Sequence, residues 1–172
     1  MAEDLVKQSV LDRVTGADRV ITGGGGQGRL PRTWEESVKL LEENVLKDLE
    51  RLLNTRQVSK PAGPPHEHLE KSLFNYGLLD FSNLSTDSSR TPDEIRRLIK
   101  EAIELFEPRL TDVEVVDPLA GQESKQETRR RRTVRFRIEA TLRTDPDPER
   151  VEFDTVLDVH SKRFQVSGDP DA

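Results

Sequence analysis

The segment 91–116 constrains the fold more than any other part of the sequence, because it joins a helix with a strong start signal to a strand. Thr91 supplies a capping hydroxyl and Pro92 a proline at the first helical position. Glu94 follows where its carboxylate can accept a hydrogen bond from the backbone N–H of the capping residue. Pro108 lacks a backbone donor and disfavours helical backbone at Glu107. The helix is therefore expected to end by about Glu107.

The apolar residues on the two sides of Pro108 follow two different periods. On the helical side they recur at helical spacing, as Ile95, Leu98, Ile99, Ala102, Leu105 and Phe106. Beyond the proline they alternate, so that Val113 and Val115 share one face. The helix is expected to bury one face, and the strand after it to carry one apolar side.

A second helix is predicted over residues 33–54. Thr33 and Glu36 form a capping box at its start. Its apolar stripe comprises Val38, Leu41, Val45, Leu49, Leu52 and Leu53. Asn54 and Arg56 follow as polar residues suited to a terminal turn, with Arg56 near the negative end of the helix.

The C-terminal third alternates between apolar and polar residues, which predicts an antiparallel pair of strands with one buried face. The inner residues are Val134, Phe136, Ile138, Ala140 and Leu142 on the first strand and Val151, Phe153, Thr155, Leu157 and Val159 on the second. We expect Arg143 opposite Glu152 and Arg137 opposite Asp158. A shift by two residues would bring Glu139 opposite an aspartate, so the charges are expected to set the register.

These elements predict an α+β fold, with two main helices on one face of a small antiparallel meander and a flexible N-terminal arm. The expected division is an arm with a glycine-rich linker (1–32), one domain (33–167) and a short tail (168–172). The sheet should have its edges at the first strand, near Val113, and at the last, near Phe164. An exposed edge is a place where another chain can add a strand.

The arm contains a small apolar set at helical spacing, formed by Val10, Leu11 and Val14. It is too short to fold alone. Three states are open to such an arm: it docks on its own domain, it is offered to a neighbouring protein, or it remains a disordered leader.

Three motifs suggest chemistry that their context does not support. Residues 23–28 match a dinucleotide-binding glycine pattern, but no strand precedes them and no helix opens on them, so they predict a flexible linker. His66 and His68 do not share a helix face and have no evident further ligands, so no metal site is expected. The arginines 129–132 lead into an alternating strand whose outer face also carries acids, which disfavours nucleic-acid binding.

The composition narrows the class of protein further. The 172 residues are 33% hydrophobic and 35% charged, which predicts a modest core. The net charge of −6 gives no support for nucleic-acid binding, and the absence of cysteine excludes a disulfide framework. No apolar run is long enough to span a membrane, and the acidic start is unlike a secretory signal. A cytoplasmic protein is expected.

Glu107 and Arg109 flank the helix-ending Pro108 and carry opposite charges. Two interpretations are open. The pair can be an exposed ion pair of little energetic value, which the residues alone favour. Alternatively it is a rigid pair that binds a partner protein, in which the planar guanidinium of Arg109 recognises a carboxylate or backbone carbonyls.

Five short motifs occur in an order that resembles the TssE family of type VI secretion baseplate subunits, which is related to the baseplate wedge protein of contractile-tail phages. The motifs are Ser9-Val10-Leu11-Asp12-Arg13, Asp48-Leu49-Glu50-Arg51-Leu52-Leu53-Asn54-Thr55-Arg56, Asn75-Tyr76-Gly77-Leu78, Phe106-Glu107-Pro108-Arg109-Leu110 and Phe153-Asp154-Thr155. The resemblance covers roughly residues 9–166. No single motif is diagnostic, but the ordered set is fairly specific.

The resemblance implies a structural role without catalysis, cofactor or metal. Such subunits sit in the wedges of a cytoplasmic baseplate beside subunits of the TssF, TssG and TssK type. Their fold is similar to the strand-exchanging domain of sheath subunits of the TssB and TssC type, so they look like a template for sheath polymerisation. The resemblance implies partner contacts at Glu107, Pro108 and Arg109. We extend that expectation to the other motifs at Val10, Leu11, Arg13, Val14, Asn54, Arg56, Asn75 and Tyr76.

A peptidoglycan-cleaving hydrolase is the alternative function, because related proteins are sometimes called lysozyme-like. A muramidase needs two carboxylates across the scissile bond, one of them shielded by apolar walls. Glu107 with Asp112 is the best pair in the sequence, but both are expected at an exposed turn. Aromatic residues make up only 5% of the chain, and no aromatic cleft is evident.

Overall fold

The structure is a computed structural model of the whole chain. The residues that it describes are 5–6, 8, 10–16, 18–20, 29–57, 72–79, 91–118, 133–145 and 147–168, without the side chains of Leu11 and Thr91. The glycine pattern at 23–28, the pair His66 and His68, and the arginines 129–132 lie outside these residues.

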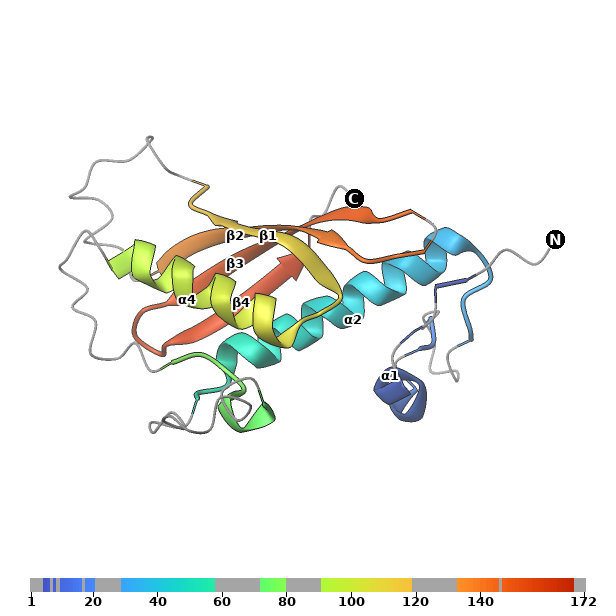
Figure 1. Cartoon of the computed structure of the whole chain (residues 1–172), viewed down its shortest axis with the longest axis horizontal. Helices are drawn as coiled ribbons and strands as arrows, with labels where there is room; N and C mark the ends of the chain where they lie inside the picture. Colours follow the sequence, from blue (N-terminus) through green and yellow to red (C-terminus); the bar gives the residue numbers. More distant parts are fainter. Residues whose placement is uncertain are drawn as a thin grey trace.

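Within the described residues, the chain forms four helical elements and one antiparallel sheet (Figure 1). The helical elements are α1 (Val10–Thr15), α2 (Trp34–Asn54), the short 3-10 helix η1 (Leu73–Asn75) and α4 (Thr91–Phe106). The strands are β1 (Leu110–Val116), β2 (Thr133–Leu142), β3 (Glu149–Asp158) and β4 (Arg163–Gly168), paired in sequence order. Both long helices cover the same face of the sheet, which confirms the predicted α+β class.

The core lies between the two long helices and the inner face of the sheet. The fully buried side chains include Val45 and Leu49 of α2, Ile99 and Ile103 of α4, and Phe136, Phe153 and Phe164 of the sheet. The predicted stripe of α4 needs one correction. Leu105 is 41% exposed, and Ile103, which the expected stripe lacked, is fully buried instead. Burial there follows the sheet surface beneath the helix rather than the apolar spacing alone.

The predicted register of β2 against β3 is wrong by four residues. Arg137 lies opposite Asp154 rather than Asp158, and Arg143 lies outside the ladder rather than opposite Glu152. Both registers keep the apolar residues on the inner face, because a shift by an even number of residues changes no side chain's face. The observed pairing leaves only residues 143–148 as the connection, a tighter loop than the expected one.

The observed register places Glu139 opposite Glu152, the kind of like-charge pair that the sequence argument excluded. Neighbouring arginines compensate for it. Arg137 lies 3.4 Å from Glu152 and 2.9 Å from Asp154, and Arg150 lies 3.9 Å from Glu139. Diagonal ion pairs of this kind neutralise a repulsive cross-strand pair, so charge alone did not determine the register.

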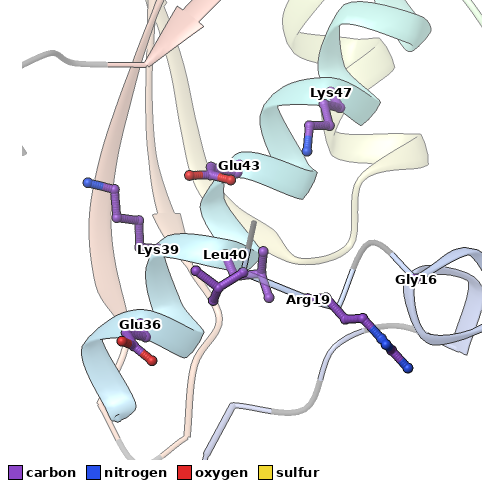
Figure 2. A pocket seen from close by; sticks show the side chains of 8 residues that line it. Gly16, Arg19, Glu36, Lys39, Leu40, Glu43 and Lys47 are labelled. Carbon is purple, nitrogen blue, oxygen red and sulfur yellow. The ribbon is translucent and has the colours of Figure 1, made fainter. Parts of the chain in front are cut away.

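The start of α2 also anchors the segment that precedes it. The Thr33 hydroxyl accepts a hydrogen bond from the Glu36 amide at 3.2 Å, as the capping box predicts, while the Glu36 carboxylate accepts from the amide of Arg32 at 2.8 Å. Gly16 and Val20 lie beside this end of the helix. With side chains of α2 they line a partly open pocket of about 210 Å³ (Figure 2).

Gly77 allows the segment after η1 to pair with the end of α2. Leu78 donates its amide to the Thr55 carbonyl at 2.9 Å and accepts from the Gln57 amide at 2.8 Å. Gly77 has φ of +113°, and a Cβ there would lie 2.4 Å from the Thr55 oxygen. Only glycine fits this close approach of two backbones.

We expect Gly77→Ala to lower the free energy of unfolding by more than about 1 kcal/mol, because it adds both backbone strain and a clash with Thr55. Urea denaturation monitored by circular dichroism measures the change. Gly16→Ala is the matched control, since Gly16 also has positive φ but a Cβ there meets nothing within 4 Å. Equal effects of the two substitutions would contradict the packing argument.

Candidate functional site

Glu107 and Arg109 form a tight bidentate pair across Pro108. The Arg109 Nε donates to Glu107 Oε1 at 2.6 Å, and Nη2 donates to Glu107 Oε2 at 2.6 Å. Glu107 is only 5% exposed, which corrects the expectation that both acids of this region sit at an exposed turn. Burial makes the pair different from a surface ion pair, because a buried carboxylate without a cation would be costly.

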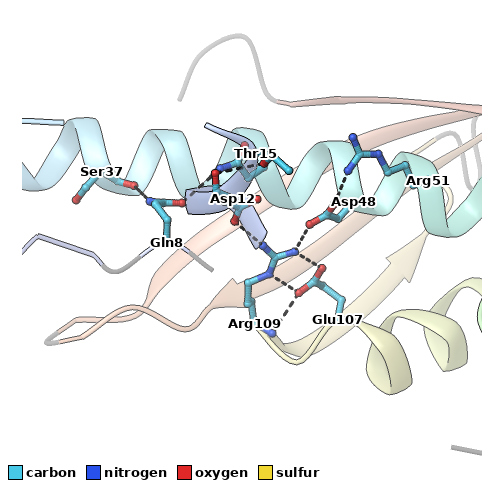
Figure 3. Close-up of polar contacts among 9 residues, drawn as sticks. Gln8, Asp12, Thr15, Ser37, Asp48, Arg51, Glu107 and Arg109 are labelled. Atoms are coloured by element: carbon cyan, nitrogen blue, oxygen red, sulfur yellow. Dashed lines mark hydrogen bonds and ion pairs between the residues drawn. The ribbon is translucent and has the colours of Figure 1, made fainter. Parts of the chain in front are cut away.

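The same guanidinium binds carboxylates from two other segments. Its Nη2 lies 2.6 Å from Asp48 of α2, and its Nη1 lies 3.9 Å from Asp12 of α1 (Figure 3). Arg51 adds a second cation 3.1 Å from Asp48. We call Asp12, Asp48, Glu107 and Arg109 the Arg109 cluster. It joins the arm, the first long helix and the helix-to-strand junction at one point.

The electrostatics of the cluster keep Arg109 charged. Burial by itself lowers the pKa of the guanidinium, but hydrogen bonds to Glu107 and Asp48 outweigh burial, and the pKa is raised above its ordinary value. The pKa of Tyr76 is also raised, first by burial and then by the negative charges of Asp48 and Glu107. The cluster therefore holds a charged guanidinium among three carboxyl side chains.

The arm docks on α2 through a seam of polar groups. Gln8 donates its Nε2 to the Ser37 carbonyl at 3.0 Å and accepts from Asn44 Nδ2 at 3.4 Å. The Val6 amide donates to the Ser37 hydroxyl at 3.2 Å. Gln8, Ser37 and Asn44 are all buried, so these hydrogen bonds are shielded from water.

The polar seam leaves the apolar residues of α1 pointing outward. Val10 is 74% exposed and Val14 is 79% exposed, and Arg13 between them is also exposed. Of the three states open to the arm, the structure shows docking on its own domain, through Gln8 and Asp12 rather than through Val10 and Val14. Leu11 belongs to α1, but its side chain lies outside the described features.

An ion pair fixes the chain between the arm and α2. Val20 and Arg29 form an antiparallel bridge, with hydrogen bonds of 2.8 and 3.2 Å. The Arg29 guanidinium then binds Glu36 through two hydrogen bonds of 2.8 and 2.5 Å. These bonds, with one from the Arg32 amide, lower the pKa of Glu36 to about 2.

The other expected partner residues have contacts within the chain. Asn54 donates to the Phe164 carbonyl and accepts from the Phe164 amide, both at 2.9 Å. Asn75 is buried, and the Tyr76 ring packs edge-to-face on Phe106 with centroids 5.3 Å apart. The remaining residue, Arg56, is exposed beside Leu78. The structure thus brings Glu107 and Arg109 close to the arm but leaves Asn54 at the edge of β4.

Sequence reasoning missed Asp12, Asp48 and Gln8. All three come from parts of the chain that lie far from Arg109 in sequence, and a charged or amide residue on a helix gives no signal of its distant partner. Among the described residues, no group of three or more histidine or acidic side chains could hold a metal ion. None of the described helices is long and apolar enough to cross a membrane.

We expect Arg109→Ala to lower the free energy of unfolding by about 3 kcal/mol, because it leaves the buried Glu107 carboxylate without a cation. The double variant Glu107→Gln with Arg109→Ala should be more stable than the single one, since it removes that charge. Urea denaturation of the four proteins in the cycle measures the coupling. Additive effects of the two substitutions would show that the pair is not energetically linked.

The lowered pKa of Glu36 predicts a specific acid response. Its carboxylate should titrate near pH 2 in the folded chain. A folded-state pKa below the unfolded value contributes stability above about pH 4.5 that is lost as the pH falls toward 2. Carbon-detected NMR titration of the side-chain carboxyl group measures this pKa.

Arg29→Gln should raise the pKa of Glu36, because it removes both side-chain hydrogen bonds. Arg32→Gln is the matched control, since Arg32 contributes its backbone amide rather than its side chain. An unchanged pKa of Glu36 in Arg29→Gln would contradict the assignment.

Comparison with models of protein families identifies a match. The family model described as baseplate wedge protein gp25 matches residues 39–147, which is more than half of the chain. The matched part contains Asp48, Glu107 and Arg109, whereas the arm and strands β3 and β4 lie outside it. No curated protein matches the chain.

Proposed function

Because the chain belongs to the family of the baseplate wedge protein gp25, we propose that it is a structural subunit of a type VI secretion baseplate wedge, of the TssE kind. The family match carries the proposal, since it covers α2 from residue 39 onward, α4 and the helix-to-strand junction after α4. Family membership favours a structural role in a contractile baseplate over catalysis. The expected location is the cytoplasm.

The partners we propose inside the wedge are subunits of the TssF, TssG and TssK type. The Arg109 cluster supports a rigid contact surface, because it fixes three separate segments through charged hydrogen bonds. The exposed face of α1 lies beside this cluster and carries Val10, Arg13 and Val14. Exposed apolar side chains next to a fixed charged centre are typical of protein contact surfaces.

For sheath subunits of the TssB and TssC type we propose contact by strand addition at the edge of β4. The Asn54 side chain already hydrogen-bonds to the amide and the carbonyl of Phe164. An added strand therefore cannot pair with these groups in the first half of β4. Since backbone groups alternate in direction along a strand, the amides and carbonyls of Val166 and Gly168 also point away from β3. No hydrogen bond from another described residue to these groups is present.

The opposite edge of the sheet is less suited to an added strand. The pairing of β1 is irregular between Thr111 and Glu114, where Asp112 has φ of +51°. Lys100 of α4 reaches Glu114 at 2.9 Å. A bulge and a charged side chain at an edge both hinder pairing with another strand. The second half of β4 is therefore the edge we propose for the sheath.

The alternative of a peptidoglycan hydrolase has little support from the geometry. A general acid must present a proton to the leaving group, but both oxygens of Glu107 accept hydrogen bonds from Arg109 inside the molecule. Asp112, the second carboxylate considered, is exposed at the bulge of β1. Neither acid lines the pocket described beside α2.

Co-purification tests the proposed function. The tagged full chain is expressed in cells shown to produce the TssF, TssG and TssK type subunits, purified at moderate salt, and its partners are identified by mass spectrometry. We expect recovery of these baseplate subunits. Recovery of none of them would contradict the wedge assignment and favour hydrolase assays on purified peptidoglycan.

A proline substitution tests strand addition separately. Val166→Pro removes an outward amide, so it should keep the fold and the baseplate partners but cost each added strand one hydrogen bond, about 1 kcal/mol. Val166→Ala controls for the lost side chain. Counting fluorescent sheaths in cells measures polymerisation. Sheath numbers that are equal for the proline and alanine variants would contradict addition at this edge.

A further inference from the structure

The side-chain amide of Asn54 takes the place of a strand residue at the edge of β4. Its Nδ2 donates to the Phe164 carbonyl and its Oδ1 accepts from the Phe164 amide, both at 2.9 Å. In an antiparallel ladder, two residues that face each other in a hydrogen-bonded pair exchange the same two bonds. Asn54 therefore satisfies Phe164 in the way that one residue of an added strand would.

The end of α2 holds this amide in position. The Asn54 Nδ2 also donates to the Glu50 carbonyl at 2.8 Å, so both of its hydrogens are used. The helix itself packs alongside β4, which brings its last residue next to the start of that strand. The amide is thus fixed on the edge by hydrogen bonds to both elements.

The second half of the β4 edge differs from the first in polarity and in pairing. Val166 and Leu46 of α2 are partly buried apolar residues that pack against the core. Leu46 lies close to Gly168, where a Cβ would be 3.4 Å from the Leu46 Cδ1. Among the described residues, none hydrogen-bonds to the outward amide or carbonyl of Val166. This half combines backbone groups that a strand can bind with apolar surface that it can cover.

Closing Phe164 removes an ambiguity in register. A shift by two residues keeps every side chain on its face, so an edge with open groups at Phe164, Val166 and Gly168 would accept a strand in more than one register. A strand shifted toward Phe164 would meet groups that Asn54 already satisfies, and its own backbone groups there would lack partners.

We propose that Asn54 is a register stop for strand addition, so that a strand of a sheath subunit begins to pair at Val166 and continues toward Gly168. The strand residue opposite Val166 is apolar, because its side chain lies on the face that Leu46 covers. This inference rests on the proposed function for the identity of the added strand. It goes further by stating which residues of the edge that strand uses and which residue of α2 selects them.

Photo-crosslinking in cells that form sheaths tests the register stop. The photoreactive amino acid p-benzoylphenylalanine is placed at position 163 or at position 167 of the tagged full chain. Arg163 and Ser167 are both exposed, and they lie on the outer face of β4, about 13 Å apart along the strand. After irradiation the chain is purified, and the captured proteins are identified and quantified by mass spectrometry.

The ratio of the two yields reports the register. With Asn54 in place, we expect position 167 to capture sheath subunits several-fold more often than position 163. Asn54→Ala frees both backbone groups of Phe164, so a strand can also pair there, and the yield at position 163 should rise to that at position 167. Glu50→Ala is the matched control, because it changes an exposed side chain one turn earlier and keeps the carbonyl that binds Asn54. It should leave the ratio unchanged.

Amide exchange in the purified chain, followed by NMR, shows whether the stop has been removed. Asn54→Ala should speed deuterium exchange of the Phe164 amide by about fivefold, the factor that corresponds to one lost hydrogen bond. The Val166 amide already points outward, so its exchange rate should not change. A variant that has lost its fold is recognised separately, because exchange then becomes faster throughout β3 and β4.

The other outcomes would overturn the inference in different ways. Equal yields at positions 163 and 167 with Asn54 in place would overturn the register stop but support strand addition at β4. A yield at position 163 that stays low in Asn54→Ala, with faster exchange at Phe164, would also overturn the stop. Capture of a second copy of this chain would overturn the sheath subunit as occupant. Capture of nothing at either position, in cells with visible sheaths, would contradict the proposed addition at this edge, while co-purification tests the baseplate assignment separately.

Discussion

The buried carboxylate of Glu107 is the constraint on which the arrangement of this molecule depends. It lies where α4 ends, and it requires a cation at hydrogen-bonding distance. Arg109 meets that need because Pro108 turns the chain and returns the guanidinium to the same side. Once fixed there, the guanidinium also binds Asp48 and faces Asp12, so a local requirement at one turn connects α4 with α2 and the arm.

Local signals made much of the fold predictable. The capping box at Thr33 marked the start of α2, Pro108 marked the end of α4, and alternation marked the strands and their inner faces. The pairing of β2 with β3 was not predictable from charge, since Arg137 and Arg150 compensate diagonally for the opposition of Glu139 and Glu152. Registers that differ by an even shift have the same inner face, and the length of the connecting loop distinguishes them.

The candidate site was predictable only in part. The sequence places Glu107 beside Arg109, but their burial depends on α2 and α1, which lie far away in the chain. The apolar residues of the arm suggested docking through Val10 and Val14, whereas the buried contacts are made by Gln8 and Asp12. Docking through polar residues gives no periodic pattern in a sequence. An amide or an acid that makes such a contact looks the same in the sequence as one that faces solvent.

The seam between the arm and α2 has a consequence for release of the arm. Its described hydrogen bonds join Gln8, Ser37, Asn44 and the amide of Val6. Water can replace each of these partners when the arm leaves α2, so these polar groups would be rehydrated. The side chain of Val6 packs against the core, so its separation would also expose apolar surface. Val10 and Val14 face solvent in the docked arm already. Release of the arm would therefore hydrate the polar groups of the seam and uncover the apolar surface beneath Val6, so it carries a small hydrophobic cost.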